Sequence, residues 1–287
     1  MLPFRILRPR SALEVMALLD EYRGGARLLL GGTDLTVGLR HGIITAETVI
    51  DLKRVQDLPS GIEATDGVLR VGANVLMADL VSHPLVGKHF PALVEAASVV
   101  GSPQIRNRAT LVGNICNASP AADTVPVLVV YGAEVHILGP GGTRAVPVVD
   151  FIVGNRKLDL GTDEFVDCVR LPLPDAPFGA AFDRITRRRG VDLATVNMCC
   201  GIGPDGKAKL AIGAASPRPL LIPDQDGIFS DETAGPADRE AALEALVSQA
   251  APISDVRASA EYRRFMLKVL GRRTQRKARE RYDALAG

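Results

Sequence analysis

Apolar residues in the first hundred positions follow a helical spacing in some stretches and an extended one in others. A first helix is predicted after the capping-box sequence that starts at Ser11, because apolar residues recur behind it at Val15, Met16, Leu19 and Tyr22. Short strands are predicted at Leu28–Leu30 and Thr48–Lys53, and the segment GIEATDGVLRVGANV predicts a hairpin that turns at Asp66-Gly67. Two helical stretches follow, around Met77–Val86 and Pro91–Val100.

Polar and small residues dominate the next segment, up to Ser119-Pro120. That pair has the sequence of a helix N-cap followed by proline at the first helical position, so a helix to about Tyr131 is predicted. The strand patterns AEVHIL and EFVDCVRLPLP come next, and the second runs into a proline cluster at Pro172–Pro177. This cluster is the strongest composition break in the second half, and we place a domain boundary there, which gives domains 1–174 and 175–287.

The second domain has strand patterns first and helical patterns last. AAFDRITRR, ATVNMCCGI and KAKLAIGAA predict three strands, with a turn at Pro204-Asp205-Gly206 between the last two. The C-terminal residues have helical spacing, first in ADREAALEALVSQA and then at Tyr262, Phe265, Met266, Val269 and Leu270. This order favours an α+β fold for the second domain.

Composition narrows the class of protein. The chain has 287 residues, 47% of them hydrophobic, which is enough for two cores, and its net charge of +1 gives no general reason to expect a nucleic-acid or anionic-membrane partner. No apolar run reaches the roughly 18 residues of a membrane helix, and the N-terminus lacks a signal-peptide pattern. The four cysteines have no C-x-x-C spacing, so we expect a cytoplasmic protein with buried thiols and no metal site of its own.

Two glycine-containing loops are the candidates for ligand binding. The first, Gly31-Gly32-Thr33-Asp34, follows a predicted strand; the second runs from Thr110 through Gly113-Asn114 toward Asp123. Exposed backbone N–H groups at such loops can bind a phosphate or diphosphate. Asp123, expected in the first turn of a helix, could either interact favourably with the helix dipole or accept hydrogen bonds from a sugar or ligand hydroxyl. An ordinary turn is the competing interpretation for each loop. Neither loop matches G-x-G-x-x-G or the P-loop.

No side chain stands out as an acid–base catalyst. The four histidines, at 41, 83, 89 and 136, have no metal-ligand spacing, and Cys199-Cys200 lies in a predicted buried strand where packing is the simpler explanation. The C-terminal segment from Arg263 to Arg281 carries nine basic residues and one acid, Glu280. Nucleic-acid binding, a solvated helix face and a docking face for an acidic partner are all open for it, with the solvated face preferred.

Four segments in this order resemble one known family: LLLGGTDLTVGLR, GSPQIRNRATLVGNICNASPAADTVPVLVV, AFDRITRRRGVDLATV and ISDVRASAEYRRFMLKVL. Over nearly its whole length the chain is similar to the FAD-binding medium subunit of the molybdenum hydroxylases, which include carbon monoxide dehydrogenase and xanthine dehydrogenase. The resemblance implies an α+β protein: a vanillyl-alcohol-oxidase-type (PCMH-type) FAD-binding domain of two α/β subdomains, followed by a small domain with a three-stranded antiparallel sheet and a helical bundle.

The resemblance also implies which residues bind FAD. The first loop would hold the diphosphate, the second loop would form the opposite wall, and a few further positions would contact the flavin or adenine. By match to the family pattern these residues are Leu30, Gly31, Gly32, Thr33, Asp34, Leu35, Val100, Thr110, Gly113, Asn114, Asp123, Val166, Phe182 and Arg184. Two positions depart from the family: Val112 replaces a glycine of the T-x-G-G-N pattern, and Arg184 replaces a lysine that reaches the flavin.

In such a family the partners carry the other cofactors. A large subunit with a molybdenum cofactor would hydroxylate the substrate, a small subunit with 2Fe–2S clusters would pass the electrons on, and FAD here would deliver them to NAD or another acceptor. Any membrane association would then come through the complex, since this chain has no membrane segment. The alternatives are a self-sufficient FAD-dependent oxidoreductase acting on a small substrate and a non-enzymatic binding module that uses the basic C-terminal helices.

Overall fold

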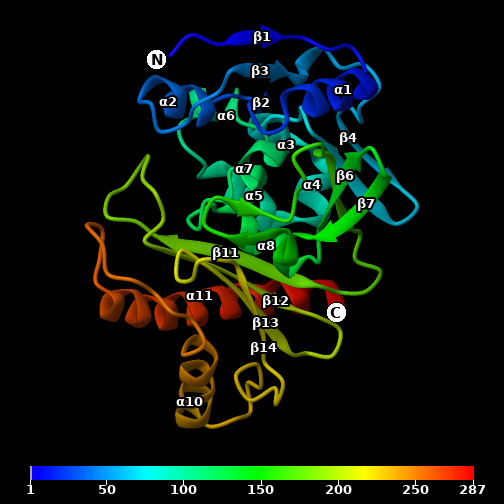
Figure 1. The fold of residues 1–287 in the computed structure, drawn as a ribbon. Helices are drawn as coiled ribbons and strands as arrows, with labels where there is room; N and C mark the ends of the chain where they lie inside the picture. The colour runs from blue at the N-terminus through cyan, green and yellow to red at the C-terminus, as the bar shows by residue number, and fades with distance from the viewer. Residues whose placement is uncertain (1) are drawn as a thin grey trace.

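The computed structural model describes residues 2–287 and contains three packed units, each with its own sheet and hydrophobic core (Figure 1). The N-terminal unit has a three-stranded parallel sheet in the order β1-β3-β2. Its elements are β1 (Arg5–Leu7), α1 (Ala12–Tyr22), β2 (Ala26–Leu29), α2 (Leu35–Arg40), β3 (Thr48–Asp51) and the short 3-10 helix η1 (Leu52–Arg54). Ser11 caps α1 as predicted, because its side chain accepts a hydrogen bond from the Glu14 N–H.

The middle unit has a five-stranded antiparallel sheet in the order β4-β5-β10-β6-β7. These strands are β4 (Ile62–Thr65), β5 (Val68–Gly72), β6 (Glu134–Gly139), β7 (Gly142–Pro147) and β10 (Phe165–Pro172). The hairpin turn at Asp66-Gly67 is confirmed, and both residues have the positive φ of a two-residue turn. The remaining elements are α3 (Met77–Ser82), α4 (Pro84–His89), α5 (Pro91–Ser98), α6 (Pro103–Arg106), α7 (Leu111–Cys116), α8 (Thr124–Val130), α9 (Val148–Phe151), β8 (Ile152–Gly154) and β9 (Lys157–Leu158).

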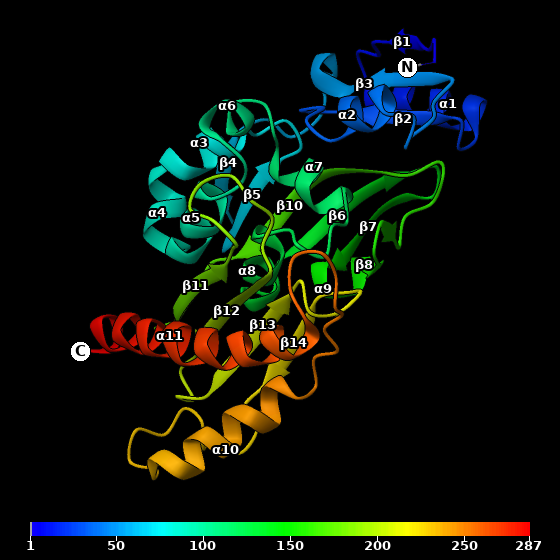
Figure 2. The ribbon, with the colours of Figure 1, turned by 90° about the vertical axis from the view of Figure 1, so that its left-hand side faces the viewer.

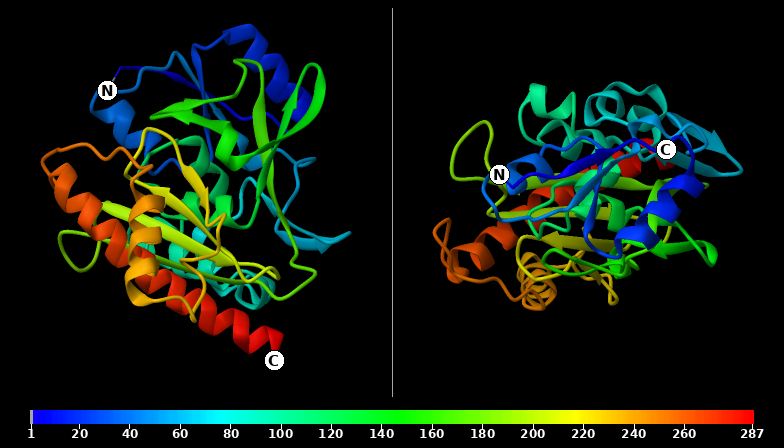
Figure 3. Two further views of the ribbon diagram at one scale, coloured as in Figure 1. Left: turned by 90° about the horizontal axis from the view of Figure 1, so that it is seen from below. Right: turned by 45° about the horizontal axis from the view of Figure 1, so that its top comes forward.

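The C-terminal unit is an antiparallel sheet between two layers of helices. Its strands follow each other in the order β11 (Gly179–Ile185), β12 (Val196–Ile202), β13 (Ala208–Gly213) and β14 (Leu220–Pro223), and its helices are α10 (Pro236–Val247) and α11 (Ala260–Ala286). Helix α11 lies across one face of the sheet (Figure 2) and runs the length of the unit (Figure 3), while α8 of the middle unit packs against β12 and β13. Cys199 therefore points into the middle core and Cys200 into the C-terminal core, which confirms the packing interpretation.

Three predicted element details were wrong. The expected helix at Met77–Val86 is split into α3 and α4, because Pro84 keeps the preceding His83 out of the helical conformation. The helix expected to start at Ser119-Pro120 starts instead at Thr124, and the Ser119 side chain accepts only from the Ala121 N–H in a turn. The small sheet has four strands rather than three, since the proline-flanked Leu220–Pro223 pairs with β13 at the sheet edge.

Most cations of the basic C-terminal segment form ion pairs within the chain. Eight of its nine cations lie within 4.0 Å of a carboxylate, and these carboxylates come from α5, β11, α10, the segment between α10 and α11, and α11 itself. Lys277 and Arg281 both pair with Glu95 of α5, so they join the C-terminal unit to the middle one. These pairs favour the helix-face interpretation of the basic segment over nucleic-acid binding.

None of the helices in residues 2–287 is long and apolar enough to cross a membrane.

Candidate functional site

The two glycine-containing loops lie directly against each other. A Cβ atom on Gly31 would stand 2.0 Å from the carbonyl oxygen of Arg108, two residues before Thr110. Gly31 therefore lacks a side chain because another backbone passes there. Gly32 has φ +73°, the left-handed region that favours glycine, and this lets the chain turn from β2 into α2. The glycine pair thus serves to bring the two loops together and to aim the first one.

The first loop presents backbone N–H groups that the protein itself leaves unused. Within residues 2–287, none of the N–H groups of residues 31–34 donates a hydrogen bond to a backbone carbonyl outside the regular helices and strands. The Gly32 carbonyl, in contrast, accepts from both the Thr36 N–H (3.0 Å) and the Thr36 hydroxyl (2.6 Å), which fixes the start of α2. Asp34 makes no side-chain cap, so its carboxylate does not occupy these donors. A row of free N–H groups on a half-buried loop suits an anionic diphosphate.

The second loop is held in place by its own caps. Thr110 is 3% exposed, and its hydroxyl accepts a hydrogen bond from the Gly113 N–H at 3.0 Å at the start of α7. The Asn114 side-chain oxygen accepts from the Thr124 hydroxyl at 2.7 Å, which ties α7 to the start of α8. Val112 is 1% exposed and packs into the middle core, so its side chain points away from the loop surface. The side chain of Val112, which replaces a glycine of the family pattern, is therefore accommodated in the middle core.

Asp123 is the buried charge of the site. It stands at the N-cap of α8, is 6% exposed, and forms an ion pair with Arg184 of β11, with 2.6 Å between Oδ2 and Nη1. The Asn197 side-chain amide donates to its other oxygen at 3.0 Å. Burial raises the pKa of Asp123 to about 6, while the Arg184 charge and the Asn197 hydrogen bond act in the opposite direction.

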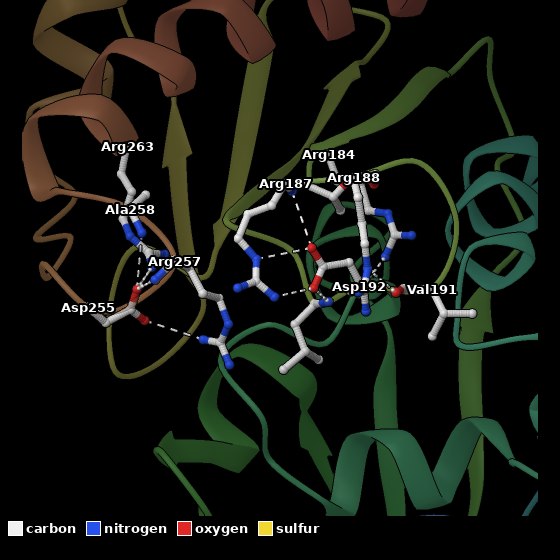
Figure 4. Close-up of polar contacts among 11 residues, drawn as sticks. Arg184, Arg187, Arg188, Val191, Asp192, Asp255, Arg257, Ala258 and Arg263 are labelled. Atoms are coloured by element: carbon white, nitrogen blue, oxygen red, sulfur yellow. Dashed lines mark hydrogen bonds and ion pairs between the residues drawn. The ribbon is translucent and has the colours of Figure 1, made fainter.

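Arg184 is fixed by a second contact besides Asp123. Its guanidinium also donates to the Asp192 carbonyl at 3.3 Å, at the base of the exposed loop that joins β11 to β12. The Asp192 carboxylate in turn binds the Arg187 guanidinium at 2.9 Å, as Figure 4 shows, which closes the loop on itself. The cation at the site is therefore held from two sides, one of them a loop that faces solvent.

The apolar candidates lie deeper in the protein than the loops. Val166 is 4% exposed and Phe182 is 7% exposed, and both pack in the middle core; Val100 is half-buried against the same core. The Phe182 N–H donates to Glu95 at 3.0 Å. Leu30 packs against both the N-terminal and middle cores. The structure thus brings the two loops into contact, ties the second loop to Thr124 beside Asp123, and places the side chains of Val166 and Phe182 in the middle core.

Three residues of the site were not predicted from the sequence. Asn197 is completely buried and holds Asp123; Thr124 holds Asn114; and Lys53 donates to the Leu30 carbonyl at 3.3 Å beside the first loop. An asparagine in the middle of the apolar strand ATVNMCC could have indicated such a role, because a buried amide needs partners. Thr124 and Lys53 carry no comparable signal in the sequence.

The parallel-sheet unit and the middle unit meet at two glycine-containing loops, and the first loop offers unused N–H donors, an arrangement that suits a cofactor with a diphosphate. A family model described as FAD binding domain in molybdopterin dehydrogenase matches residues 2–174, and one described as CO dehydrogenase flavoprotein C-terminal domain matches residues 180–278. The chain belongs to this family of FAD-binding subunits of molybdenum hydroxylases, an oxidoreductase family, and FAD is its cofactor.

Individual relatives agree with the family models. The chain is 32% identical over 250 residues to the putative xanthine dehydrogenase FAD-binding subunit of Escherichia coli, covering 85% of this chain and 86% of that one. It is 28% identical over 272 residues to the carbon monoxide dehydrogenase medium chain of Hydrogenophaga pseudoflava, covering 92% of each. A solved structure of carbon monoxide dehydrogenase from the same organism superposes with a TM-score of 0.90 at 28% identity, over 98% of this chain and 99% of that one. The resemblance stated from the sequence is confirmed.

Proposed function

We propose that this chain is the electron-transferring FAD subunit of a molybdenum hydroxylase complex. Its partners would be a large molybdopterin-binding subunit, which oxidises the substrate, and a small subunit with 2Fe–2S clusters, which supplies the electrons. NAD or another acceptor would receive them. The relatives named medium chain or FAD-binding subunit support this role. The observation that carries the proposal is the row of unused N–H groups at residues 31–34, packed against the second loop.

The residues of the two loops would hold the cofactor. The N–H groups of Gly32, Thr33 and Asp34 would donate to the diphosphate, and Thr110, Gly113 and Asn114 would form the second wall. Leu30 and Leu35 would border the first loop, and Val100, Val166 and Phe182 would supply apolar surface. When bound, FAD supplies the redox chemistry, and the protein contributes binding, orientation and electrostatics.

Arg184 would contribute the electrostatic part. Its guanidinium carries a permanent charge, and the hydrogen bonds to Asp123 and to the Asp192 carbonyl fix it at the site. A fixed cation near a bound flavin favours the negative charge that accompanies reduction. Replacing Arg184 with Ala should therefore lower the flavin reduction potential, whereas Arg184→Lys should restore most of it. An unchanged potential in Arg184→Ala would count against this role.

The alternative is a self-sufficient flavoenzyme. Such an enzyme needs an acid or base that can exchange a proton with a small substrate. Among the carboxylates in residues 2–287, we consider Asp123 the best candidate for such an acid or base. Both of its oxygens already accept hydrogen bonds, one from Arg184 and one from Asn197. The electron-transfer role fits this better, because it needs no proton transfer by a side chain.

We also propose that the domains are residues 1–174 and 175–287, and that the protein is cytoplasmic.

The two functions differ in what the isolated chain can do. The chain should be purified alone and with its partners, loaded with FAD, and assayed for substrate-dependent reduction of the flavin by absorbance. We expect the isolated chain to hold FAD and to remain oxidised with small substrates, while the full complex reduces the flavin. Turnover of a small substrate by the isolated chain would establish the alternative. A complex whose flavin stays oxidised, although its molybdenum subunit turns over substrate, would reject the electron-transfer role.

A further inference from the structure

A second cluster of chemically active side chains lies in the five-stranded sheet, away from the two loops. His136 of β6 stands across from Cys168 of β10, and Asp167 precedes Cys168. One imidazole nitrogen, one carboxylate oxygen and the thiol sulfur lie within 4.8 Å of one another. Within residues 2–287 this is the one place where three such groups converge. These are the nitrogen, oxygen and sulfur ligands that Zn²⁺ takes in proteins.

A β-bulge creates the convergence. The pairing of β10 with β6 shifts register between Val166 and Cys168, so Asp167 is an extra residue on its strand. Neighbouring residues of a regular strand point to opposite faces, and Asp167 would then face away from Cys168. The bulge turns the carboxylate toward the thiol and the imidazole, and bulges commonly re-aim a side chain in this way. The backbone is therefore shaped to gather these three groups.

Cys168 is not an ordinary core cysteine. It is completely buried, yet it belongs to none of the three hydrophobic cores, whereas Cys199 and Cys200 each pack in one. Its environment is polar: burial raises the pKa of the thiol to about 12, the Asp167 carboxylate acts in the same direction, and Arg170 acts against both. A buried thiol that faces a carboxylate and an imidazole is placed as a ligand rather than as a filler of apolar space.

The geometry of the cluster suits a tetrahedral ion with one open position. The His136 Nδ1 and Asp167 Oδ1 atoms are 2.8 Å apart, so a small outward shift of either would admit an ion between them. The Asp167 and His136 side chains are 6% and 14% exposed, and the imidazole is therefore the side from which solvent reaches the cluster. Three protein ligands and one water would complete the coordination.

We propose that His136, Asp167 and Cys168 form a binding site for one Zn²⁺ ion, separate from the FAD site. Binding replaces the hydrogen bond between His136 and Asp167 with two bonds to the metal. The Zn–S bond forms as the thiol loses its proton to solvent, so a thiolate, a carboxylate and a neutral imidazole balance the two positive charges to zero. The ion would fasten β6 to β10 at the bulge, the point where their ladder of hydrogen bonds is interrupted.

The test uses the full-length chain loaded with FAD and treated with a chelator, then titrated with Zn²⁺ by calorimetry. We expect one equivalent to bind with a micromolar or tighter dissociation constant. Cys168→Ser and His136→Gln should each weaken binding at least tenfold, because even a residue that only supports a metal ligand typically contributes tenfold or more to affinity. Cys116→Ser and His89→Gln are the matched controls and should bind Zn²⁺ as the wild type does. FAD content and melting temperature verify that each variant is folded.

Co²⁺ provides a second measurement that reports the ligands directly. In the wild type it should give the visible bands of a four-coordinate cobalt thiolate at wavelengths beyond the flavin absorption, and Cys168→Ser should lose them. Asp167→Asn should keep the bands and bind more weakly. Absence of stoichiometric Zn²⁺ binding to the folded wild type would overturn the proposal. Binding that survives unchanged in Cys168→Ser and His136→Gln would also overturn it.

Discussion

Asp123 and Asp167 are both buried carboxylates with one basic partner, and the difference between their partners separates the two sites. Asp123 faces a guanidinium that stays charged at every accessible pH, and the Asn197 amide supports it. Asp167 faces the imidazole of His136 and the thiol of Cys168, which offer a nitrogen and a sulfur ligand. The first arrangement holds a charge pair at the proposed cofactor site. The second brings together the nitrogen, oxygen and sulfur atoms that a metal ion can bind.

The strongest way to break this comparison is to remove the guanidinium. Arg184→Ala leaves the Asp123 carboxylate buried without its charge partner, and breaking a buried pair in this way costs about 3–5 kcal/mol. Urea unfolding at pH 7 should show this loss, and Arg184→Lys should recover a large part of it. A loss below about 1 kcal/mol, within the range of an exposed ion pair, would mean that the pair is solvated rather than buried.

The next largest effect is expected in the pH dependence of stability, which reports on the buried carboxylate of Asp123. The folded pKa of Asp123, about 6, lies above its unfolded value, so between about pH 4 and pH 6 the folded state binds more protons than the unfolded state. Stability from this group is therefore largest at low pH and declines as the pH rises through that window. Relative to Asp123→Asn, the wild type should lose on the order of 2 kcal/mol between pH 4 and pH 6.5.

Asp123→Asn is the reference here because it keeps the side chain's shape and removes its titration. The cost of the Arg184 charge left unpaired in that variant is the same at every pH in the window, so the difference between the two proteins isolates the carboxylate. The result that contradicts the account is a difference in the opposite direction, with the wild type gaining stability relative to Asp123→Asn as the pH rises. That would place the folded pKa below the unfolded one.

Contact between the two loops can be tested with a single methyl group. Gly31→Ala places a Cβ 2.0 Å from the Arg108 carbonyl oxygen, so the loops must separate. We expect about 1–3 kcal/mol of destabilisation, as for other overpacked sites, and at least a tenfold weaker affinity for FAD in a fluorescence titration. Gly87→Ala in α4 is the matched control, since its Cβ would meet no atom within 4 Å and its φ is not positive. If the two variants bind FAD with equal affinity, the contact between the loops is not required for cofactor binding.

The smallest expected effect concerns the imidazole. His136→Gln removes the ionisable partner of Asp167 but keeps a hydrogen-bond donor in the same region, so without metal the loss should be about 0.5–1.5 kcal/mol. Thermal melts of this variant should show no rise in melting temperature with Zn²⁺, whereas the wild type should melt higher. If both proteins respond to Zn²⁺ alike, the ion binds elsewhere, and the contrast between Asp123 and Asp167 reduces to a difference in hydrogen bonding.

Local patterns in the sequence predicted much of the fold. The Ser11 cap, the Asp66-Gly67 hairpin and the strands of the second domain rest on residues close in sequence, and each is confirmed. The start of α8 was misplaced, since Ser119-Pro120 has the local preference of a helix start, while packing around Asp123 and Asn197 decides where the helix begins. The edge strand at Leu220–Pro223 was missed because its prolines oppose a strand and only its pairing with β13 reveals it.

The site could be predicted only in part, because local sequence patterns reveal its loops but not the contacts between distant segments. Gly31 and Gly32 could be recognised as a place of close approach, but the sequence does not say that the approaching atom belongs to Arg108, some eighty positions away. Asn197 reaches the site from β12 and Lys53 reaches it from η1, and contacts between such distant elements leave no local pattern in the sequence. The Asp167 bulge is likewise invisible in the sequence, because only the register with β6 shows that Asp167 and Cys168 face the same side.

The central claim, that the first loop binds the diphosphate of FAD, is tested most directly by a crystal structure of the FAD-loaded chain. The account predicts diphosphate oxygens within about 3.2 Å of backbone nitrogens among Gly32, Thr33 and Asp34, with the second loop on the opposite side. A structure in which those nitrogens bind only water or protein atoms, with the diphosphate held elsewhere, would contradict it.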